Sequence, residues 1–390
     1  MRLSPTHIGL LLSGVLSTFA FAQETDVSSQ QEFDVIYAPA MQASSKLIIK
    51  NPLIATAKLS NRLVAVGSHG NIITRDLNSN TWKQANVPTS VLLTSVDFES
   101  DSIGYAAGHH GVILKTTDGG NTWQRIFDGF DLLDLEVAFY QQRIAELEQK
   151  IAADGDESGD LQWALDDAKF YLENAQRAKQ ETGPSKPILD IKTLANGDVL
   201  AVGAYNTLLV SQDKGANWQL ISGRLDNPNG FHLNAIATQG DNVFIAGEAG
   251  TAYASQDGGA SWSSVAPPYD GSLFGAHFDN QGRLWTYGLR GNIFVSDDLG
   301  ERYTAIDSPA DANLMSGYAG TKGTQWIVGN SGVILEITPS LDVTEHTHPS
   351  SAVFGDMVEF NGEKVLTSRS GIYYWPAKTT QSDTAEKGLE

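Results

Sequence analysis

The chain has no cysteine among its 390 residues, and this absence removes several kinds of chemistry at once. Disulfide bonds, thiolate nucleophiles, zinc–thiolate sites and a lipoprotein anchor are all excluded. Basic residues are also scarce, because 26 Lys and Arg face 46 Asp and Glu and leave a net charge of −20. A nucleic-acid partner requires basic patches, so this charge argues against one, and it also disfavours an anionic membrane surface.

Long apolar runs are missing apart from one near the amino terminus. Arg2 precedes an apolar stretch at 8–21, and Ala20 and Ala22 form a small-x-small cleavage site. A stretch of about 14 residues is too short to cross a hydrocarbon core of ~30 Å. We therefore expect residues 1–22 to be a signal peptide, and the exported protein to act in the periplasm.

The sequence does contain a repeat, in which an apolar strand, a tight turn and a second strand recur. Glycines mark six of the turns, and their spacings are 41, 95, 44, 41 and 41 residues. A period near 40 with four short strands predicts an all-β fold, a seven-bladed β-propeller over residues 33–377. The turn positions are Gly67, Gly108, Gly203, Gly247, Gly288, Gly329 and, in the seventh unit, Ser368.

The two ends of the repeat region predict how the ring closes. The seventh unit has three predicted strands and lacks a fourth, whereas residues 33–38 (FDVIYA) precede the first unit and belong to none. We predict that 33–38 pair with the last blade as its outer strand, which would leave no unfinished sheet edge. The polar tail 378–390 lies beyond the propeller.

A second motif, S/T-x-D-x-G-x-x-W, follows the second strand of several units. It predicts a hairpin corner in which the Asp accepts hydrogen bonds from turn N–H groups, the Gly takes a positive φ angle and the aromatic ring packs between blades. Because the same Asp recurs in several blades, we prefer this role in blade structure to ligand or metal binding. This Asp-box, or BNR, corner comprises Asp76, Trp82, Asp118, Gly120, Trp123, Asp213, Gly215, Trp218, Asp257, Gly259, Trp262, Asp298, Gly300 and Tyr303.

Residues 87–123, VPTSVLLTSVDFESDSIGYAAGHHGVILKTTDGGNTW, resemble the photosystem II stability/assembly factor family. That family carries a similar G-x-x-G-x-I-x-x-T-x-D-G-G-x-T-W blade in a seven-bladed propeller. The resemblance implies a non-enzymatic scaffold that binds a membrane protein complex, since plant and cyanobacterial members are lumenal assembly chaperones. Related proteins also occur in bacteria without photosynthesis, and we expect this chain to be one of them.

Residues 130–184 interrupt the repeat with a different periodicity. Apolar residues recur at alternating spacings of 3 and 4 through residues 130–151 and again through 161–179. This spacing predicts an antiparallel α-helical hairpin, inserted after the second blade. Such a hairpin could pack on its own propeller or present an apolar ridge to a partner, and the sequence leaves both alternatives open.

Strand order predicts which face of the ring carries the hairpin. In a four-stranded meander, the connections between blades emerge on the same face as the glycine turns, and the Asp-box corners emerge on the other. We take the glycine-turn face and the hairpin as the candidate partner-binding surface. Its residues are Phe139, Trp163 and Phe170 on the hairpin and His109, His110, Tyr205, Arg290 and Arg369 on the turns, with His69 and Glu248 beside them.

Metal and cofactor sites are weakly indicated. DGDESG at 154–159 resembles the start of a calcium-binding EF-hand loop, but Leu165 stands where a bidentate Glu is required. A turn that connects two helices is the simpler interpretation. The histidine pairs at 109–110 and 346–348 are interpreted as polar surface, so we expect no metal and no cofactor.

An enzymatic role is also disfavoured. Asp-box propellers include sialidases, which need an arginine triad and a Tyr nucleophile with a Glu partner. Here the arginines are scattered, and the F-R-I-P, G-x-S-x-G, H-E-x-x-H and phosphate-loop motifs are absent. The alternative to a scaffold is a carbohydrate- or small-ligand-binding module that uses the central channel. We expect a monomer, and expect an apolar ridge on the hairpin to favour a protein partner over a ligand.

Overall fold

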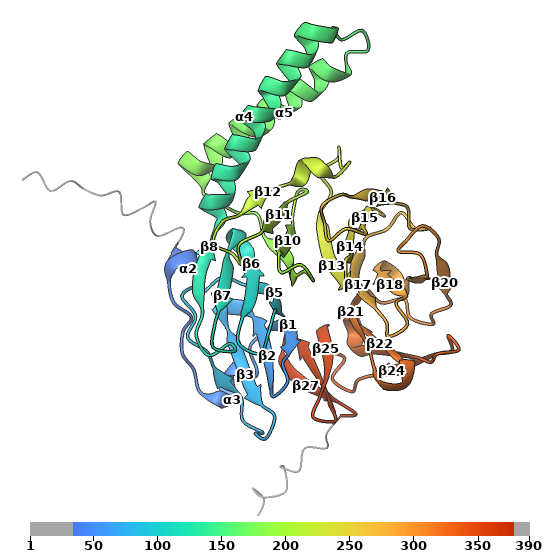
Figure 1. Cartoon of the computed structure of the whole chain (residues 1–390). Coiled ribbons are helices and arrows are strands. Elements are labelled where there is room, and N and C mark those ends of the chain that lie inside the picture. Colours follow the sequence, from blue (N-terminus) through green and yellow to red (C-terminus); the bar gives the residue numbers. More distant parts are fainter. Residues whose placement is uncertain (1–33, 378–390) are drawn as a thin grey trace, which may run out of the picture. The chain divides into compact units, whose positions relative to one another are not determined.

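The structure is a computed structural model that describes residues 34–377, so the predicted signal peptide and polar tail lie outside it. Seven antiparallel sheets are arranged in a ring (Figure 1), and each is a meander of strands that follow one another in the chain. The predicted seven-bladed β-propeller with an inserted helical hairpin is therefore confirmed. None of the helices within residues 34–377 is both long and apolar enough to cross a membrane.

The hairpin lies in the sequence between the second and the third of the first three blades. Blade one holds β1 (Leu53–Lys58), β2 (Arg62–Gly67), β3 (Ile72–Asp76) and β4 (Lys83–Gln84). Blade two holds β5 (Leu93–Phe98), β6 (Gly104–Gly108), β7 (Ile113–Thr116) and β8 (Gln124–Phe127). Blade three holds β9 (Ile188–Thr193), β10 (Val199–Gly203), β11 (Leu208–Ser211) and β12 (Gln219–Leu220).

The other four blades follow without a large insertion. Blade four holds β13 (Leu233–Gln239), β14 (Asn242–Gly247), β15 (Ala252–Ser255) and β16 (Ser263–Val265). Blade five holds β17 (Leu273–Phe278), β18 (Leu284–Gly288), β19 (Ile293–Ser296) and β20 (Thr304–Ile306). Blade six holds β21 (Leu314–Ala319), β22 (Gln325–Gly329), β23 (Val333–Ile337) and β24 (Val343–Thr347), and blade seven holds β25 (Phe354–Phe360), β26 (Glu363–Ser368) and β27 (Gly371–Trp375).

The second strand of each blade forms the blade's core. Every residue of β10 and β14 from Val199 and Val243 onward is buried, and so is every residue of β18 and β22. A strand that is covered on both faces is typically a continuous apolar run, and these runs are what stacking against two neighbouring blades requires.

The first strands of the blades contact one another in sequence and line the central channel, and β25 lies beside β1 to close the ring. Each of these inner strands has a β-bulge after its first residue, for example between Leu93 and Ser95 in β5 and between Phe354 and Asp356 in β25. A bulge bends a strand and increases its twist. The same irregularity at the same place in all seven blades therefore gives the ring a uniform inner wall.

The predicted closing strand at 33–38 is wrong. Residues Asp34–Tyr37 form a short helix, α2, and a second short helix, α3, spans Ser45–Ile48. Ile36 is fully buried, and the Val35 carbonyl accepts hydrogen bonds from Thr89 and Ser90, so this segment covers the connection between blades one and two. Blade seven keeps three strands, and on β27 the Ile372 N–H donates to the Ile49 carbonyl instead.

The hairpin consists of α4 (Gly129–Asp154) and α5 (Asp160–Arg177), followed by a π-helical turn at Ala178–Thr182. Asp128 caps α4, because its side chain accepts from the Phe130 N–H while the Asp131 side chain accepts from the Asp128 N–H. Along most of its length the hairpin has a core of its own. That core contains Tyr140, Ile144, Leu147, Ile151, Leu161, Ala164, Leu165 and Ala168.

Candidate partner-binding face

The glycine turns and the connections between blades lie together on one face of the ring. The Gly70 N–H donates to the Val91 carbonyl at 2.7 Å, and the Gly332 N–H donates to the Ala352 carbonyl at 2.7 Å. In blades one, two, four, five and six, the turn carries a residue in the left-handed region just before a glycine, with φ of 57° at His69 and 55° at Arg290. The turns therefore hold polar side chains at the surface in a conformation set by the backbone.

The base of the hairpin is anchored in the propeller. Leu132 is 2% exposed and packs into the shared core of blades two and three. Glu136, which is nearly buried, pairs with Lys186 at 2.5 Å after the hairpin ends. Phe139 lies over Gly223, where an added Cβ would be 3.2 Å from the ring. Of the two alternatives for Phe139, the structure shows packing on the propeller.

His110 also belongs to this anchor. Its Nδ1 lies 2.8 Å from the Pro184 carbonyl, and Pro184 packs against Gly129 at the start of α4. The His110 side chain therefore holds the end of the hairpin, and Pro184 itself contacts the hairpin's start. The adjacent His109 is half-buried, and burial together with the neighbouring imidazole lowers its pKa.

Tyr205 is the most exposed aromatic residue of the turns, with 63% of its surface open to solvent. Its ring lies 4.7 Å from that of His232, and the His232 Nδ1 lies 3.2 Å from a Glu248 carboxylate oxygen. The Lys186 ammonium lies 5.9 Å from the centre of the Tyr205 ring. Tyr205 and Glu248 are thus brought together beside the hairpin base.

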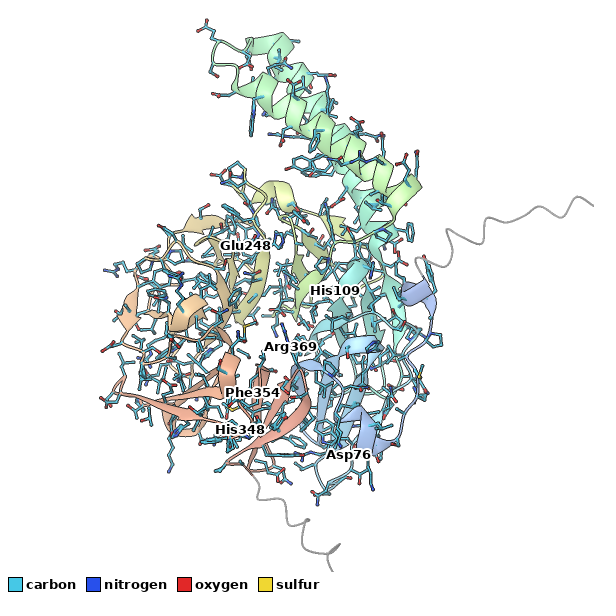
Figure 2. All side chains as sticks on the ribbon, turned by 180° about the vertical axis from the view of Figure 1, so that it is seen from behind. Asp76, His109, Glu248, His348, Phe354 and Arg369 are labelled. Atoms are coloured by element: carbon cyan, nitrogen blue, oxygen red, sulfur yellow. The ribbon has the colours of Figure 1, made fainter. Side chains whose placement is uncertain are left out.

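The remaining predicted face residues belong to other blades. His69, Arg290 and Arg369 are exposed on the turns of blades one, five and seven. Figure 2 labels Arg369 with His109 and Glu248 around the middle of the ring. The structure places these residues on the same kind of turn but shows no direct contact between Arg290 or Arg369 and the cluster around Tyr205 within residues 34–377.

The outer surface of α5 carries the two other predicted hairpin residues. Trp163 is 64% exposed and Phe170 is 59% exposed, and they are seven residues apart on the same helix. Tyr171 stacks on Tyr140 of α4 with ring centres 5.4 Å apart, which joins the two helices. Trp163 and Phe170 therefore form an apolar surface that faces solvent, unlike Phe139.

The Asp-box corners lie at the opposite ends of the strands. In blade two, one Asp118 oxygen accepts from the N–H groups of Asn121 and Thr122 at 3.0 and 2.9 Å. Asp257 accepts likewise from Ser261, whose hydroxyl and N–H lower the pKa of Asp257 to about 2. The four corner glycines, in blades two to five, have φ angles of 85° to 92°: Gly120, Gly215, Gly259 and Gly300.

The first residue of the motif has a role that the sequence interpretation missed. The Thr116 hydroxyl accepts from the Gly120 N–H at 3.0 Å and donates to Asp118, and Ser255 does the same for Gly259 and Asp257. A hydroxyl at this position completes the corner, and its recurrence as Ser or Thr was the available signal.

Two corner aromatic residues, Trp123 and Tyr303, pack on rings of their own blade, and Trp218 and Trp262 pack toward the preceding blade. The Trp123 ring lies 6.0 Å from Phe98, and the Trp218 ring lies 5.8 Å from Phe127 of blade two. Trp262 contacts the apolar core centred on blade three, and Tyr303 lies 6.3 Å from Phe294 within its own blade. These contacts cover the corners and join neighbouring blades.

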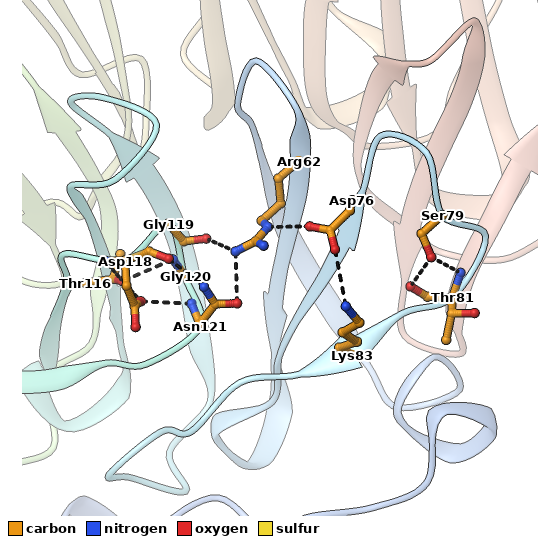
Figure 3. Close-up of polar contacts among 10 residues, drawn as sticks. All are labelled: Arg62, Asp76, Ser79, Thr81, Lys83, Thr116, Asp118, Gly119, Gly120 and Asn121. Atoms are coloured by element: carbon orange, nitrogen blue, oxygen red, sulfur yellow. Dashed lines mark hydrogen bonds and ion pairs between the residues drawn. The ribbon is translucent and has the colours of Figure 1, made fainter.

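The first blade departs from the pattern. Asp76 pairs with Arg62 at 2.8 Å and with Lys83 at 3.3 Å. Its carboxylate therefore binds side chains of its own sheet instead of the turn N–H groups. Trp82 is still buried. Arg62 in turn donates to the Gly119 carbonyl of blade two, and Figure 3 shows this arginine between the two blades. The longer turn of blade one changes the role of its Asp.

The central channel contains a charged group that its neighbours neutralise. Lys192 of β9 lies 3.6 Å from Asp97 of β5. Burial opposes the charged form of Lys192, but the carboxylates of Asp97 and two further aspartates outweigh it and raise its pKa. At the end of the channel away from the glycine turns, a shallow hollow is lined by Lys58, Asn280, Tyr318, Ala319, Gly320, Thr321, Val358 and Glu359.

The turn that connects the hairpin helices has a structural use for one acidic residue. An Asp156 oxygen accepts from the Gln162 N–H at 2.6 Å in the first turn of α5. Within residues 34–377, no three His, Asp or Glu side chains are grouped so that they could hold a metal ion.

Fold and surface together define a seven-bladed β-propeller with an appended helical hairpin. A family model described as photosynthesis system II assembly factor YCF48 matches residues 74–148 and 174–270. Over these residues the chain is similar to the photosystem II assembly factor-like propellers, as the resemblance implied. No curated protein matches the sequence.

Solved structures agree on the fold. A structure named "YCF48 bound to D1 peptide" is 17% identical with a TM-score of 0.55, covering 83% of this chain and 92% of its own. YCF48 from Cyanidioschyzon merolae is 13% identical with a TM-score of 0.54, covering 83% and 95%. The WD40 propeller domain of Doa1 is 9% identical with a TM-score of 0.55, covering 86% and 94%.

Proposed function

We propose that the protein is a non-enzymatic, exported scaffold that binds a membrane protein complex and helps it to assemble or to work. It would act in the periplasm of a bacterium that does not photosynthesise, or in the thylakoid lumen if the host does. The glycine-turn face and the hairpin would form the binding surface, with Tyr205 beside the hairpin base and the aromatic residues of α5 farther along it.

The observation that carries this proposal is the exposed aromatic surface of the hairpin. Trp163 and Phe170 keep more than half of their surface open to solvent, although Phe139 of the same hairpin is covered by the propeller. Large aromatic side chains supply much of the binding energy at protein interfaces. An apolar ridge of this kind favours a protein partner.

The likeness to assembly-factor propellers supports the same conclusion. A propeller of this fold, YCF48, has been solved with a bound D1 peptide. Fold alone does not decide function, but the family match adds to the surface argument. We extend peptide binding from that protein to this chain as part of the proposal.

A small-ligand module in the central channel has less support. The ammonium group of Lys192 on the channel wall is already paired with carboxylates. The hollow at the end of the channel is open and shallow, whereas ligand sites normally enclose most of the ligand's surface.

Affinity co-purification from gently solubilised envelope membranes tests the proposal. The tagged full-length chain is compared with a variant that lacks residues 141–170, because Tyr140 and Tyr171 stack and can be joined by a short Gly-Ser bridge. A Tyr205→Ala variant reports on the turn face. We expect a membrane protein to accompany the full-length chain, to be lost with the deletion and to be reduced with Tyr205→Ala. Retention of no protein by the full-length chain would reject the scaffold.

A further inference from the structure

The outer face of α5 combines exposed aromatic rings with carboxylates. Trp163 and Phe170 are seven residues apart, so their Cα atoms are about 10 Å apart along the helix. Asp166 and Asp167 lie three and four residues from each ring, which are the spacings of neighbours on a helical surface. The two adjacent carboxylates therefore lie between the two aromatic rings along the helix surface.

These two carboxylates lack a basic partner. Two lysines of the hairpin pair elsewhere, Lys169 with Glu148 at 3.2 Å and Lys179 with Asp134. Among the described residues, no Lys, Arg or His nitrogen lies within 4.0 Å of Asp166 or Asp167, and Asp166 accepts only from the Gln162 amide. Partial burial of Asp167 raises its pKa, so a cation brought close to it would relieve an existing cost.

The charge of the whole hairpin decides between possible occupants. Residues 129–182 contain 13 Asp and Glu against five Lys and Arg. A second copy would bring the same negative surface against this one, and an anionic lipid surface would be repelled in the same way. A segment with Lys or Arg on one side and apolar residues on the other matches both the rings and the carboxylates.

We propose that the outer face of α5 docks a basic, amphipathic helical segment of a partner protein, with Trp163 and Phe170 contacting its apolar residues. The carboxylates of Asp166 and Asp167 receive its Lys or Arg side chains, which can also lie over the Trp163 ring. This inference rests on the proposed scaffold function and specifies the chemistry of the segment that the hairpin recognises.

Peptide selection tests the inference with the full mature chain. A displayed library of random peptides of about 20 residues, ~30 Å long as a helix, is depleted on a Trp163→Ala/Phe170→Ala double variant and then selected on the wild type. We expect the recovered peptides to be rich in Lys and Arg, with apolar residues at helical spacing. A synthetic recovered peptide should bind the double variant at least about 10-fold more weakly.

A matched pair of charge variants separates local recognition from bulk charge. Asp166→Asn/Asp167→Asn should weaken binding of the synthetic peptide by about 10-fold and reduce its salt dependence. Asp154→Asn/Glu157→Gln removes the same charge at the connecting turn and should change affinity by less than about 2-fold. All four positions are on the surface, and unchanged thermal unfolding of each variant establishes that it is folded.

Three outcomes would overturn the inference. Recovered peptides without basic residues, or none that survive the depletion, would exclude this partner chemistry. If both charge variants weaken peptide binding equally, the binding reflects non-specific attraction to the negative charge of the hairpin. A dimer in analytical ultracentrifugation that the double variant abolishes would assign the surface to a second copy. In each case, loss of a membrane partner with the 141–170 deletion would leave the proposed function standing.

Discussion

Asp356 of the last blade accepts hydrogen bonds from both the backbone N–H and the hydroxyl of Thr56 in the first blade, at 2.8 and 2.6 Å. The same carboxylate accepts from the Ser316 hydroxyl of blade six at 2.6 Å. One side chain thus connects three inner strands at the point where the chain closes its ring. Burial raises its pKa, although the hydroxyl and N–H donors act in the opposite direction.

Asp356→Ala should destabilise the propeller by about 3 kcal/mol, because several donors are left without an acceptor in a half-buried site. Hydrogen exchange should show the loss first in β1 and β25. Asp190→Ala is the matched control, since Asp190 accepts from Ser95 and Ile236 between blades two, three and four. If both variants lose protection at the same strands, Asp356 has no special role in closure.

Trp123→Ala should lower the free energy of unfolding by about 3–5 kcal/mol. Trp123 is 4% exposed, and its indole N–H donates to the Gly120 carbonyl at 3.2 Å. Trp262 is only half-buried, and no acceptor for its indole N–H is present among the described residues, so Trp262→Ala should cost less, about 1–2 kcal/mol. Urea unfolding measures both values.

A cost below about 0.5 kcal/mol for Trp123→Ala would contradict the structural role of the corner. A larger cost for Trp262 than for Trp123 would show that burial between blades does not set the contribution of these rings.

Periodicity predicted the propeller because each blade repeats the same buried strand and turn. The apolar run of β10 and the corner at Asp213 recur with little change, so their spacing alone defines a blade. The hairpin was predictable for a similar reason, since its apolar seam from Ile144 to Leu165 is a regular helical pattern.

Contacts between distant segments were not predictable in this way. FDVIYA has the composition of a strand, yet burial of Ile36 and hydrogen bonds from Thr89 hold it as a helix against blade one. The single Asp in each of β9 and β25 gives no periodic signal, although Asp190 and Asp356 join neighbouring blades. The sequence also could not show that Phe139 packs on Gly223 while Phe170 faces solvent.

Two hairpin phenylalanines should respond differently to truncation. Phe139→Ala should cost about 1–2 kcal/mol, because its ring packs over Gly223 at the hairpin base. Phe170→Ala should change stability by less than about 0.5 kcal/mol, since the side chain is 59% exposed. Chemical denaturation distinguishes them, and a large cost at Phe170 would show that α5 packs on the propeller in solution.

The same contacts bear on deletions in this region. Removal of residues 131–183 would take Leu132 out of the core of blades two and three, together with the Glu136 partner of Lys186. That variant should unfold at a clearly lower temperature than the chain lacking 141–170, which keeps both. Equal melting temperatures in calorimetry would show that the hairpin base adds nothing to the propeller.

Acid should weaken the propeller through His277 of β17. This side chain is stacked on Trp285 with ring centres 6.3 Å apart, and its Nε2 lies 3.0 Å from the Gln325 side-chain oxygen. Burial lowers the pKa of His277 to about 4. The unfolded chain binds this proton near pH 6.5, whereas the folded chain binds it only near pH 4. The stability contributed by neutral His277 is therefore fully present above pH 6.5 and is lost as the pH falls toward 4.

At about 1.4 kcal/mol for each unit of pKa, the loss between pH 6.5 and 4 should approach about 3 kcal/mol. His277→Gln keeps a polar side chain but removes the titration, so urea unfolding at pH 7 and at pH 4.5 should give it a smaller pH dependence than the wild type. His109 and His348, whose pKa values are also lowered by burial, remain in both proteins and cancel in this comparison. Parallel pH profiles for the two proteins would mean that protonation of His277 does not lower the free energy of unfolding. The site between His277 and Trp285 would then be open to water.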